Sequence, residues 1–411
     1  MNTNKINKFN SLVFSLVFLR LAFLFSSTKH ETTYLKKDSD HYLELADSIK
    51  FYFFNDSLRD YWLSTYRPMG YPIILNFLDT ITSVPNFIYI NFLGDIGTAV
   101  FVYKIVEGIT ENTLTKYMSV ILFFLNPNVL LSSSQIMTES LSLFFLTGSI
   151  YFVINKKILL AGLFIAIFSL FKPMGHVLLI LIIIVCFFWL RYNKKELLLL
   201  SVIPILCLSL ISINNQIQYE SFFYSTSPYY HLQWLNGASE ALCEELNFDQ
   251  MEVIEPGYIF EGWKENLDPK IIQNSGLFIE KLKEDSRNRT WKNIECKGAS
   301  SIHSLVWNSF GVRKAHWNET HLTKSVLNVL IYYSYFYVLL CMASLFFALF
   351  NFKEKKLRSI IYFVATYLLA SSVTLPYGNS RTRLLVEPLL VIVLSFYIEN
   401  YYPALKRKIF R

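Results

Sequence analysis

Two acidic residues near the start of the sequence have a spacing that could serve acid–base chemistry. Asp38 and Asp40 follow an apolar run, 9–27, and come just before His41. A carboxylate at such a place can take a proton from an acceptor hydroxyl or coordinate a metal ion. The structural alternative is an N-cap, in which Asp38 or Asp40 caps a helix that starts near His41 and buries Ala46. The two roles can hold together.

A second candidate is the run from Arg67 to Pro72, RPMGYP in one-letter code. Its two prolines and its glycine predict a tight, rigid turn. An arginine on a rigid turn suits a phosphate, because the planar guanidinium can donate two parallel hydrogen bonds to it. The alternative is an interfacial arginine that pairs with lipid headgroups.

Glu139 and Lys172 stand at the ends of predicted membrane helices. A buried ionisable residue in a membrane is costly without a partner, which makes Glu139 a functional candidate. The alternative is an acid favoured by the helix N-terminus, with Thr138 as the cap. Lys172 could bind an anionic ligand or extend its amine to the interface. His176 is expected to pack or donate a hydrogen bond, since the histidines show no metal-ligand spacing.

Arg381 and Arg383 occupy a very short predicted outer turn that also contains Gly378. Short outer loops are normally depleted of positive charge. Two arginines there suggest an anion held at the outer surface.

The elements that must position these residues are membrane helices. The chain has 411 residues, of which 53% are hydrophobic and only 17% are charged, whereas soluble domains have about 25% charged residues. The pattern predicts an all-α polytopic membrane protein. A helix needs about 20 residues to cross the hydrocarbon core. Candidate spans lie near 9–27, 87–107, 115–132, 138–155, 158–172, 175–191, 197–213, 326–350, 358–375 and 383–400.

The basic residues predict the orientation. Placing both termini in the cytoplasm gives every inner segment at least two lysines or arginines, as the positive-inside rule requires. The net charge of +7 follows these loops and does not indicate a nucleic-acid partner. Two outer loops remain, 28–86 and 214–325, and the first holds amphipathic pieces that should lie along the membrane surface.

These spans divide the chain into three parts: a transmembrane core, 1–213, with a catalytic first outer loop; an outer cap, 214–325; and C-terminal helices, 326–411. Cys243 and Cys296 share the cap and either form a disulfide or stay as free thiols.

The order of the motifs resembles that of the GT-C glycosyltransferases of the protein-mannosyltransferase and aminoarabinose-transferase type. In that family the first outer loop has an Asp, a Tyr four positions later and an Ala four beyond, matching Asp38, Tyr42 and Ala46. An Arg/Lys-Pro-x-Gly-Tyr-Pro turn follows, matching 67–72. Ser39 separates the two acids that are often adjacent in the family, so the choice of base stays open.

Three further motifs follow in order. A proline and a polar run ending in Thr-Glu-Ser-Leu match Pro127 and 138–141. After the seventh helix comes a Ser-rich stretch similar to 225–227, although Asn214 stands where the family has arginine. A final Gly-x-x-Arg-x-Arg pattern followed by proline is similar to Gly378, Arg381, Arg383 and Pro388. The resemblance covers about 1–230 and 355–400.

The resemblance implies a polyprenyl-phosphate sugar as the donor and an acceptor hydroxyl that attacks the anomeric carbon with inversion. Asp38 would be the general base, with Asp40 as the alternative, and Glu139 would orient the base or the acceptor. The leaving phosphate would be held by Arg67, Lys172, Arg381 and Arg383, with Tyr42, Tyr71 and His176 in support.

No cofactor is required, because a lipid phosphate is a fair leaving group, but a divalent metal stays open. We expect a bacterial inner (plasma) membrane protein with its active site facing the periplasm. The sugar is open, and the acceptor could be a lipid, a glycan or a protein.

Two other functions compete with this interpretation. An O-antigen polymerase or ligase would rely on arginines in the large outer loop and would lack the early Asp and the 67–72 turn. A transporter or flippase would place ionisable groups near the midplane, often in repeated halves. The sequence shows no internal repeat, and its candidate charges are predicted at one outer face.

Overall fold

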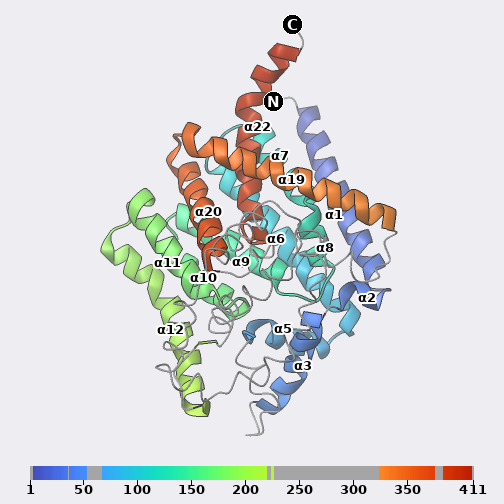
Figure 1. Ribbon diagram of the computed structural model, residues 1–411, viewed down its shortest axis with the longest axis vertical. Coiled ribbons are helices and arrows are strands. Elements are labelled where there is room, and N and C mark those ends of the chain that lie inside the picture. The colour runs from blue at the N-terminus through green and yellow to red at the C-terminus, as the bar shows by residue number, and fades with distance from the viewer. Residues whose placement is uncertain are drawn as a thin grey trace, which may run out of the picture.

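The computed structural model describes residues 3–35, 37–52, 67–219, 224–225, 324–374 and 383–409. In this part of the chain every regular element is a helix, as predicted. Helix α1 (Thr3–Ser27) begins and helix α22 (Glu387–Ile409) ends at the same end of the molecule (Figure 1). The helices at 37–52 and 70–79, in the segment predicted to be the first outer loop, lie toward the opposite end (Figure 1).

Helical structure coincides with each predicted span. The remaining long helices are α6 (Ile88–Glu107), α12 (Lys194–Tyr219), α19 (Lys324–Asn351) and α20 (Lys355–Thr374). Shorter ones are α7 (Thr113–Leu125), α8 (Pro127–Ser133), α9 (Glu139–Ile154), α10 (Ile158–Phe171), and α11 (Gly175–Val185), which continues into the π-helix η2 (Cys186–Leu190). Among the described helices, 4 are long and apolar enough to cross a membrane, or 5 if α7 and α8 form one span. The architecture is that of a polytopic membrane protein.

Helix α1 shows how these helices face lipid on one side and protein on the other. Phe14 and Phe18 are 72% and 61% exposed, whereas Arg20 and Leu24 on the other side are 3% and 0% exposed. Such a broad exposed apolar face would be unfavourable in water. Facing lipid, it carries no such cost.

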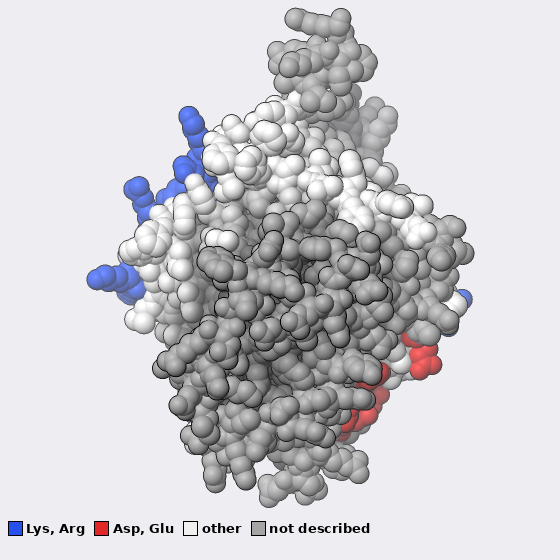
Figure 2. Space-filling view, viewed as in Figure 1, with Lys and Arg blue, Asp and Glu red and all other residues white. Residues whose placement is uncertain are grey.

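Charged side chains are unevenly distributed over the described residues on the face of the molecule that Figure 2 shows. In Figure 2 the described Lys and Arg side chains gather mainly on the flank nearer the two chain ends. The Asp and Glu side chains in view lie toward the end with α2 (Glu31–Tyr34) and α3 (Lys37–Tyr52). This is the distribution that cytoplasmic termini would give.

The span predicted near 115–132 is not one continuous helix. It divides at Asn126–Pro127 into α7 and α8, whose axes differ by 52°. Pro127 has no N–H to donate to the preceding turn, and its ring clashes with that turn, so the helix must break or kink there. The bend sends the chain toward Glu139 at the start of α9.

The turn predicted at Lys172-Pro173 is confirmed, since α10 ends at Phe171 and α11 begins at Gly175. The two helices approach closely there. A Cβ added to Gly175 would lie 1.9 Å from Oγ and 2.6 Å from Cα of Ser169. Only glycine fits this contact, which holds Lys172 at the end of the helix pair.

The helix that carries Asp38 and Asp40 begins earlier than predicted. Helix α3 already includes Lys37, so neither carboxylate caps a helix starting near His41, and that prediction is wrong. Both acids lie in the first turn instead, where the helix dipole favours negative charge. Farther along α3, Ala46 is buried as expected.

The run from Arg67 to Pro72 forms the start of helix α5 (Gly70–Asp79). Its glycine is needed mainly for a close approach between elements. A Cβ added to Gly70 would lie 2.5 Å from the carbonyl oxygen and 2.7 Å from the Cβ of Leu170, near the end of α10. The missing side chain therefore lets the first outer loop press against the turn that carries Lys172.

We expect Gly70→Ala to lower stability by about 1–3 kcal/mol, the usual cost of overpacking, because backbone atoms of Leu170 cannot rotate aside. Thermal unfolding of the detergent-purified protein measures this loss. Gly108→Ala is the matched control, since its added Cβ would lie 3.5 Å from the nearest atom. Equal stability of the two variants would contradict the close approach.

The apolar core has two parts. The larger one joins the membrane helices, while a smaller cluster lies beneath the first outer loop. The smaller cluster packs Tyr42 of α3 and Tyr71 and Leu75 of α5 against Ile136 and Phe171. Segments far apart in the sequence thus meet under α3 and α5, and they bring several predicted site residues together.

Candidate active site

The centre of the candidate site is an ion pair between Glu139 and Lys172. The Lys172 Nζ donates a hydrogen bond of 3.1 Å to Oε1 of Glu139, and their side chains are 11% and 2% exposed. Glu139 is the first residue of α9, where the helix dipole favours a carboxylate. Thr138 holds the N-cap position but makes no side-chain cap hydrogen bond. The lysine therefore supplies the partner that the buried acid needs.

Two packed tyrosine rings, Tyr42 and Tyr71, lie between this ion pair and Arg67. The Tyr42 and Tyr71 rings pack edge to face, with centroids 5.3 Å apart. The guanidinium of Arg67 lies 5.3 Å from the centroid of Tyr42, within the range of a cation–π contact. The helix and the turn thus hold the Arg67 guanidinium over the ring of Tyr42.

Tyr71 is close enough to Glu139 to feel its charge. Burial is the main reason that the pKa of Tyr71 lies above its ordinary value, and the negative charge of Glu139 adds to the rise. The phenol consequently stays protonated at neutral pH and can donate a hydrogen bond. We call Tyr42, Arg67, Tyr71, Glu139 and Lys172 the outer site.

The candidate base lies on the helix beside the outer site. Asp40 is exposed on α3, and Asp38 lies two residues earlier on the same helix. Helix α3 is tied to α5 by a 2.7 Å hydrogen bond from Nδ2 of Asn76 to the carbonyl of Ala46. This contact fixes the acidic helix next to the turn that carries Arg67.

The remaining predicted cations are placed differently. Arg381 lies outside the described residues. Arg383 is 2% exposed and pairs at 3.3 Å with Glu387, one turn later on α22. Glu387 also accepts hydrogen bonds from Asn126 at 2.7 Å and from Asn128 at 3.1 Å. In this arrangement Arg383 belongs to a second cluster at the break between α7 and α8.

His176, predicted to support the site, is half-buried in the first turn of α11.

Beyond α12, the chain turns back toward α10. Nδ2 of Asn215 lies 3.4 Å from the carbonyl of Tyr224. The Tyr224 hydroxyl donates to the carbonyl of Ser169 in α10. Ser225, in the Ser-rich stretch, is buried there. Cys243 and Cys296 lie outside the described residues.

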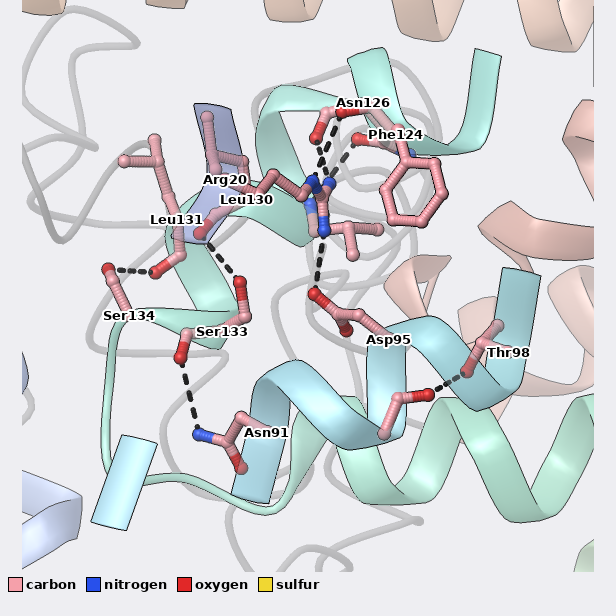
Figure 3. A network of polar contacts seen from close by, with 12 residues as sticks. Arg20, Asn91, Asp95, Thr98, Phe124, Asn126, Leu130, Leu131, Ser133 and Ser134 are labelled. Carbon is pink, nitrogen blue, oxygen red and sulfur yellow. Dashed lines mark hydrogen bonds and ion pairs between the residues drawn. The ribbon is translucent and has the colours of Figure 1, made fainter. Parts of the chain in front are cut away.

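A buried pair that the sequence argument missed lies deeper in the bundle. Nη1 of Arg20 in α1 donates a 2.6 Å hydrogen bond to Oδ2 of Asp95 in α6, and both side chains are nearly inaccessible (Figure 3). Arg20 interrupts the apolar run 9–27, and Asp95 lies in the apolar run 87–107. Each is an ionisable residue inside an apolar span, which is the signal that could have found them.

The outer site combines two cations, a buried acid and a protonated phenol. Such a set can bind an anion and orient a hydroxyl near the acidic helix α3. Among the described residues, no three His, Cys, Asp or Glu side chains gather closely enough to hold a metal ion.

The comparisons with known proteins give limited similarity. No protein-family model matches the chain, and no curated protein sequence does. Among solved structures, the chain is similar to the crystal structure of ArnT from Cupriavidus metallidurans bound to undecaprenyl phosphate. The sequences are 11% identical, the TM-score is 0.42, and the alignment covers 96% of this chain and 77% of that one. This similarity is too weak to assign an activity, which has to be argued from the chain's own residues.

Proposed function

We propose that this protein is a membrane glycosyltransferase that moves a sugar from a polyprenyl-phosphate donor to an acceptor hydroxyl at the outer face of a bacterial inner membrane. The observation that carries the proposal is the convergence of Tyr42, Arg67, Tyr71, Glu139 and Lys172 at one end of the helix bundle. These residues come from the motifs whose order resembles the GT-C family.

The reaction would be a single displacement. Asp38 takes the proton from the acceptor hydroxyl, whose oxygen bonds to the anomeric carbon as the bond to the phosphate oxygen breaks. The sugar leaves with inverted configuration, and the polyprenyl phosphate keeps the electron pair. General base catalysis of this kind typically contributes about 10²–10⁴-fold in rate.

The cations would act on the departing phosphate, where negative charge develops in the transition state. Arg67 has the planar fork that suits phosphate oxygens, and its stacking on Tyr42 would keep it oriented. Lys172 would supply a second positive charge. Arg381 and Arg383 are further candidates, although Arg383 is now paired with Glu387.

Glu139 would act indirectly. Its contact with Lys172 at 3.1 Å fixes the ammonium, and its charge acts on the Tyr71 phenol. It would thus hold the donor-binding groups in place or orient the acceptor. Tyr42, Tyr71 and His176 would support the site.

The test uses the full-length protein reconstituted in liposomes with radiolabelled undecaprenyl-phosphate mannose, glucose, galactose or aminoarabinose. Membranes of a deletion strain serve as the source of acceptor. We expect transfer of label from one donor, with release of undecaprenyl phosphate. Lipid and glycan profiles of the deletion strain should lack the same sugar. No transfer from any of the four donors, together with an unchanged profile, would refute the proposal.

A transporter or flippase is the second candidate, because the structure contains a broken span and buried charges inside the bundle. The break between α7 and α8 and the pairs Arg20–Asp95 and Arg383–Glu387 are features that transporters also use. The same liposomes separate the two functions. Movement of the labelled lipid across the bilayer without sugar transfer, persisting in Asp38→Asn, would favour transport.

A further inference from the structure

The break between α7 and α8 leaves backbone groups that lipid cannot satisfy. In a membrane each such group must find a partner within the protein. The Asn126 side chain satisfies the start of α8, since its Oδ1 accepts from the amides of Asn128 at 2.9 Å and Val129 at 3.4 Å. On the other side, the Asn126 amide donates to the Phe123 carbonyl at 3.2 Å.

Two tyrosines of α19 satisfy further carbonyls of α7. The Tyr337 hydroxyl donates to the Leu122 carbonyl at 2.9 Å, and the Tyr333 hydroxyl donates to the Leu125 carbonyl at 3.1 Å. In a continuous helix these carbonyls would accept from amides four residues later. The neighbouring helix α19 thus supplies hydrogen-bond donors to carbonyls that the break exposes.

Arg20 supplies donors to two more carbonyls at the break, of which the Asn126 carbonyl also accepts from the Leu130 amide at 3.1 Å. Its Nε donates to Phe124 at 3.2 Å and its Nη2 to Asn126 at 3.4 Å, while Nη1 pairs with Asp95 (Figure 3). The guanidinium also lies 5.3 Å from the Phe124 ring. Only arginine presents several fixed donors to three acceptors at once; a lysine ammonium is a single point.

Helix α6, which carries Asp95, packs against the segment that follows the break. One turn before Asp95, Nδ2 of Asn91 lies 3.4 Å from the Ser133 carbonyl at the end of α8. Close packing of α6 on α9 agrees, since a Cβ added to Gly94 would lie 3.1 Å from the Ser140 carbonyl. Arg20 therefore contacts the Asn126 end of the segment that runs to Glu139, and its bond to Asp95 joins it to α6, which packs against the other end.

Two more contacts hold the middle of that segment. Nδ2 of Asn91, one turn before Asp95, donates to the Gln135 carbonyl at 2.6 Å. The Ile136 amide donates to the Tyr34 carbonyl in α2 at 2.9 Å. The segment that ends in Glu139 is therefore attached to α1, α6 and the beginning of the first outer loop.

We propose that Arg20 and Asp95 are positioning residues that hold the break between α7 and α8 and so place Glu139 in the outer site. This inference rests on the proposed function for its kinetic readout. A pair that served only to neutralise buried charge could be replaced by two apolar residues without loss of activity. A positioning pair could not be replaced in this way, because the hydrogen bonds from Arg20 to Phe124, Asn126 and Asp95 would be lost.

The kinetic test compares the wild-type protein, Arg20→Lys and the double variant Arg20→Met/Asp95→Leu with the best labelled donor of the panel above. Arg20→Lys keeps the charge, and the double variant removes both charges. We expect kcat to fall by about 10–100-fold in both, the scale of a small misplacement at a reacting centre, with the KM for the donor within about twofold.

Arg358→Lys is the matched control, because Arg358 is exposed and donates to Tyr362 at 3.1 Å, with no contact to the break. Its kcat should be unchanged. If Arg20→Lys does not fold, the double variant decides alone. Wild-type kcat in the folded double variant would overturn the proposal.

A second readout does not depend on enzyme activity. Tyr34→Cys and Ile136→Cys are combined in a chain whose native cysteines are replaced, and disulfide formation is followed under mild oxidation. Positioning predicts at least tenfold slower formation when Arg20→Met/Asp95→Leu is added. An unchanged rate would overturn the positioning role even if no donor is ever turned over. Failure of transfer by the wild-type protein, with the expected slowing, would refute only the proposed function.

Discussion

Replacing Asp38 by asparagine is expected to lower kcat for sugar transfer by about 10²–10⁴-fold, the usual contribution of a general base. Asparagine keeps the size and the hydrogen-bonding shape of the side chain but cannot accept the proton. Helical spacing puts Asp38 one turn before Tyr42, which is buried beneath Arg67. The KM for the donor should change little, because the proposed donor-binding groups, Arg67 among them, are intact in this variant. Initial rates with the labelled lipid donor measure the effect.

Two further variants of the same helix locate the base. Asp40→Asn tests the alternative base, and the larger loss of kcat identifies the residue that takes the proton. Asp47→Asn is the matched control, because Asp47 is exposed on α3 and belongs to none of the motifs. Full activity of both Asp38→Asn and Asp40→Asn would rule out the proposed mechanism.

Breaking the Glu139–Lys172 pair is expected to have a large effect on stability. Removing one partner takes the opposite charge at 3.1 Å away from a nearly buried ionised group, a change of the kind that costs about 3–5 kcal/mol. Both Glu139→Gln and Lys172→Met should therefore unfold at clearly lower temperatures in detergent. Transfer should also be lost, because each variant removes a group of the outer site.

The double variant Glu139→Gln/Lys172→Met separates stability from function. With both charges gone, most of the stability should return, while kcat should stay low. The exposed pair Lys104–Glu107, at 2.7 Å with side chains 48% and 40% exposed, provides the comparison. Lys104→Met should cost at most about 1 kcal/mol. A double variant that transfers sugar at the wild-type rate would remove Glu139 and Lys172 from the site.

Much of the helical framework could be predicted from the sequence, because a bilayer leaves the chain few alternatives. A long apolar run must form hydrogen bonds within itself, so the segments later seen as α1, α6, α12 and α19 were recognisable by length and composition. The turn at Lys172 was recognisable because proline follows the only charge in a stretch too long for one span.

The same reasoning placed Glu139 correctly at the start of a helix but could not name its partner. Lys172 is 33 residues away, and the contact depends on how α9 packs against α10. Glycine at position 70 pointed to a turn, whereas its decisive property is the approach to Leu170 that a Cβ would block. Sequence patterns for helices and turns describe one element at a time. They do not show which other segment of the backbone will pack against it.

What the sequence determined by itself is the all-helical membrane architecture and the set of charged residues that had to find partners. Only the tertiary structure decided the pairing: Glu139 with Lys172, Arg383 with Glu387, and Arg20 with Asp95. The physical reason is that burial in an apolar medium demands a counterion for each charge, while the choice among distant counterions follows from helix packing and from the break at Pro127.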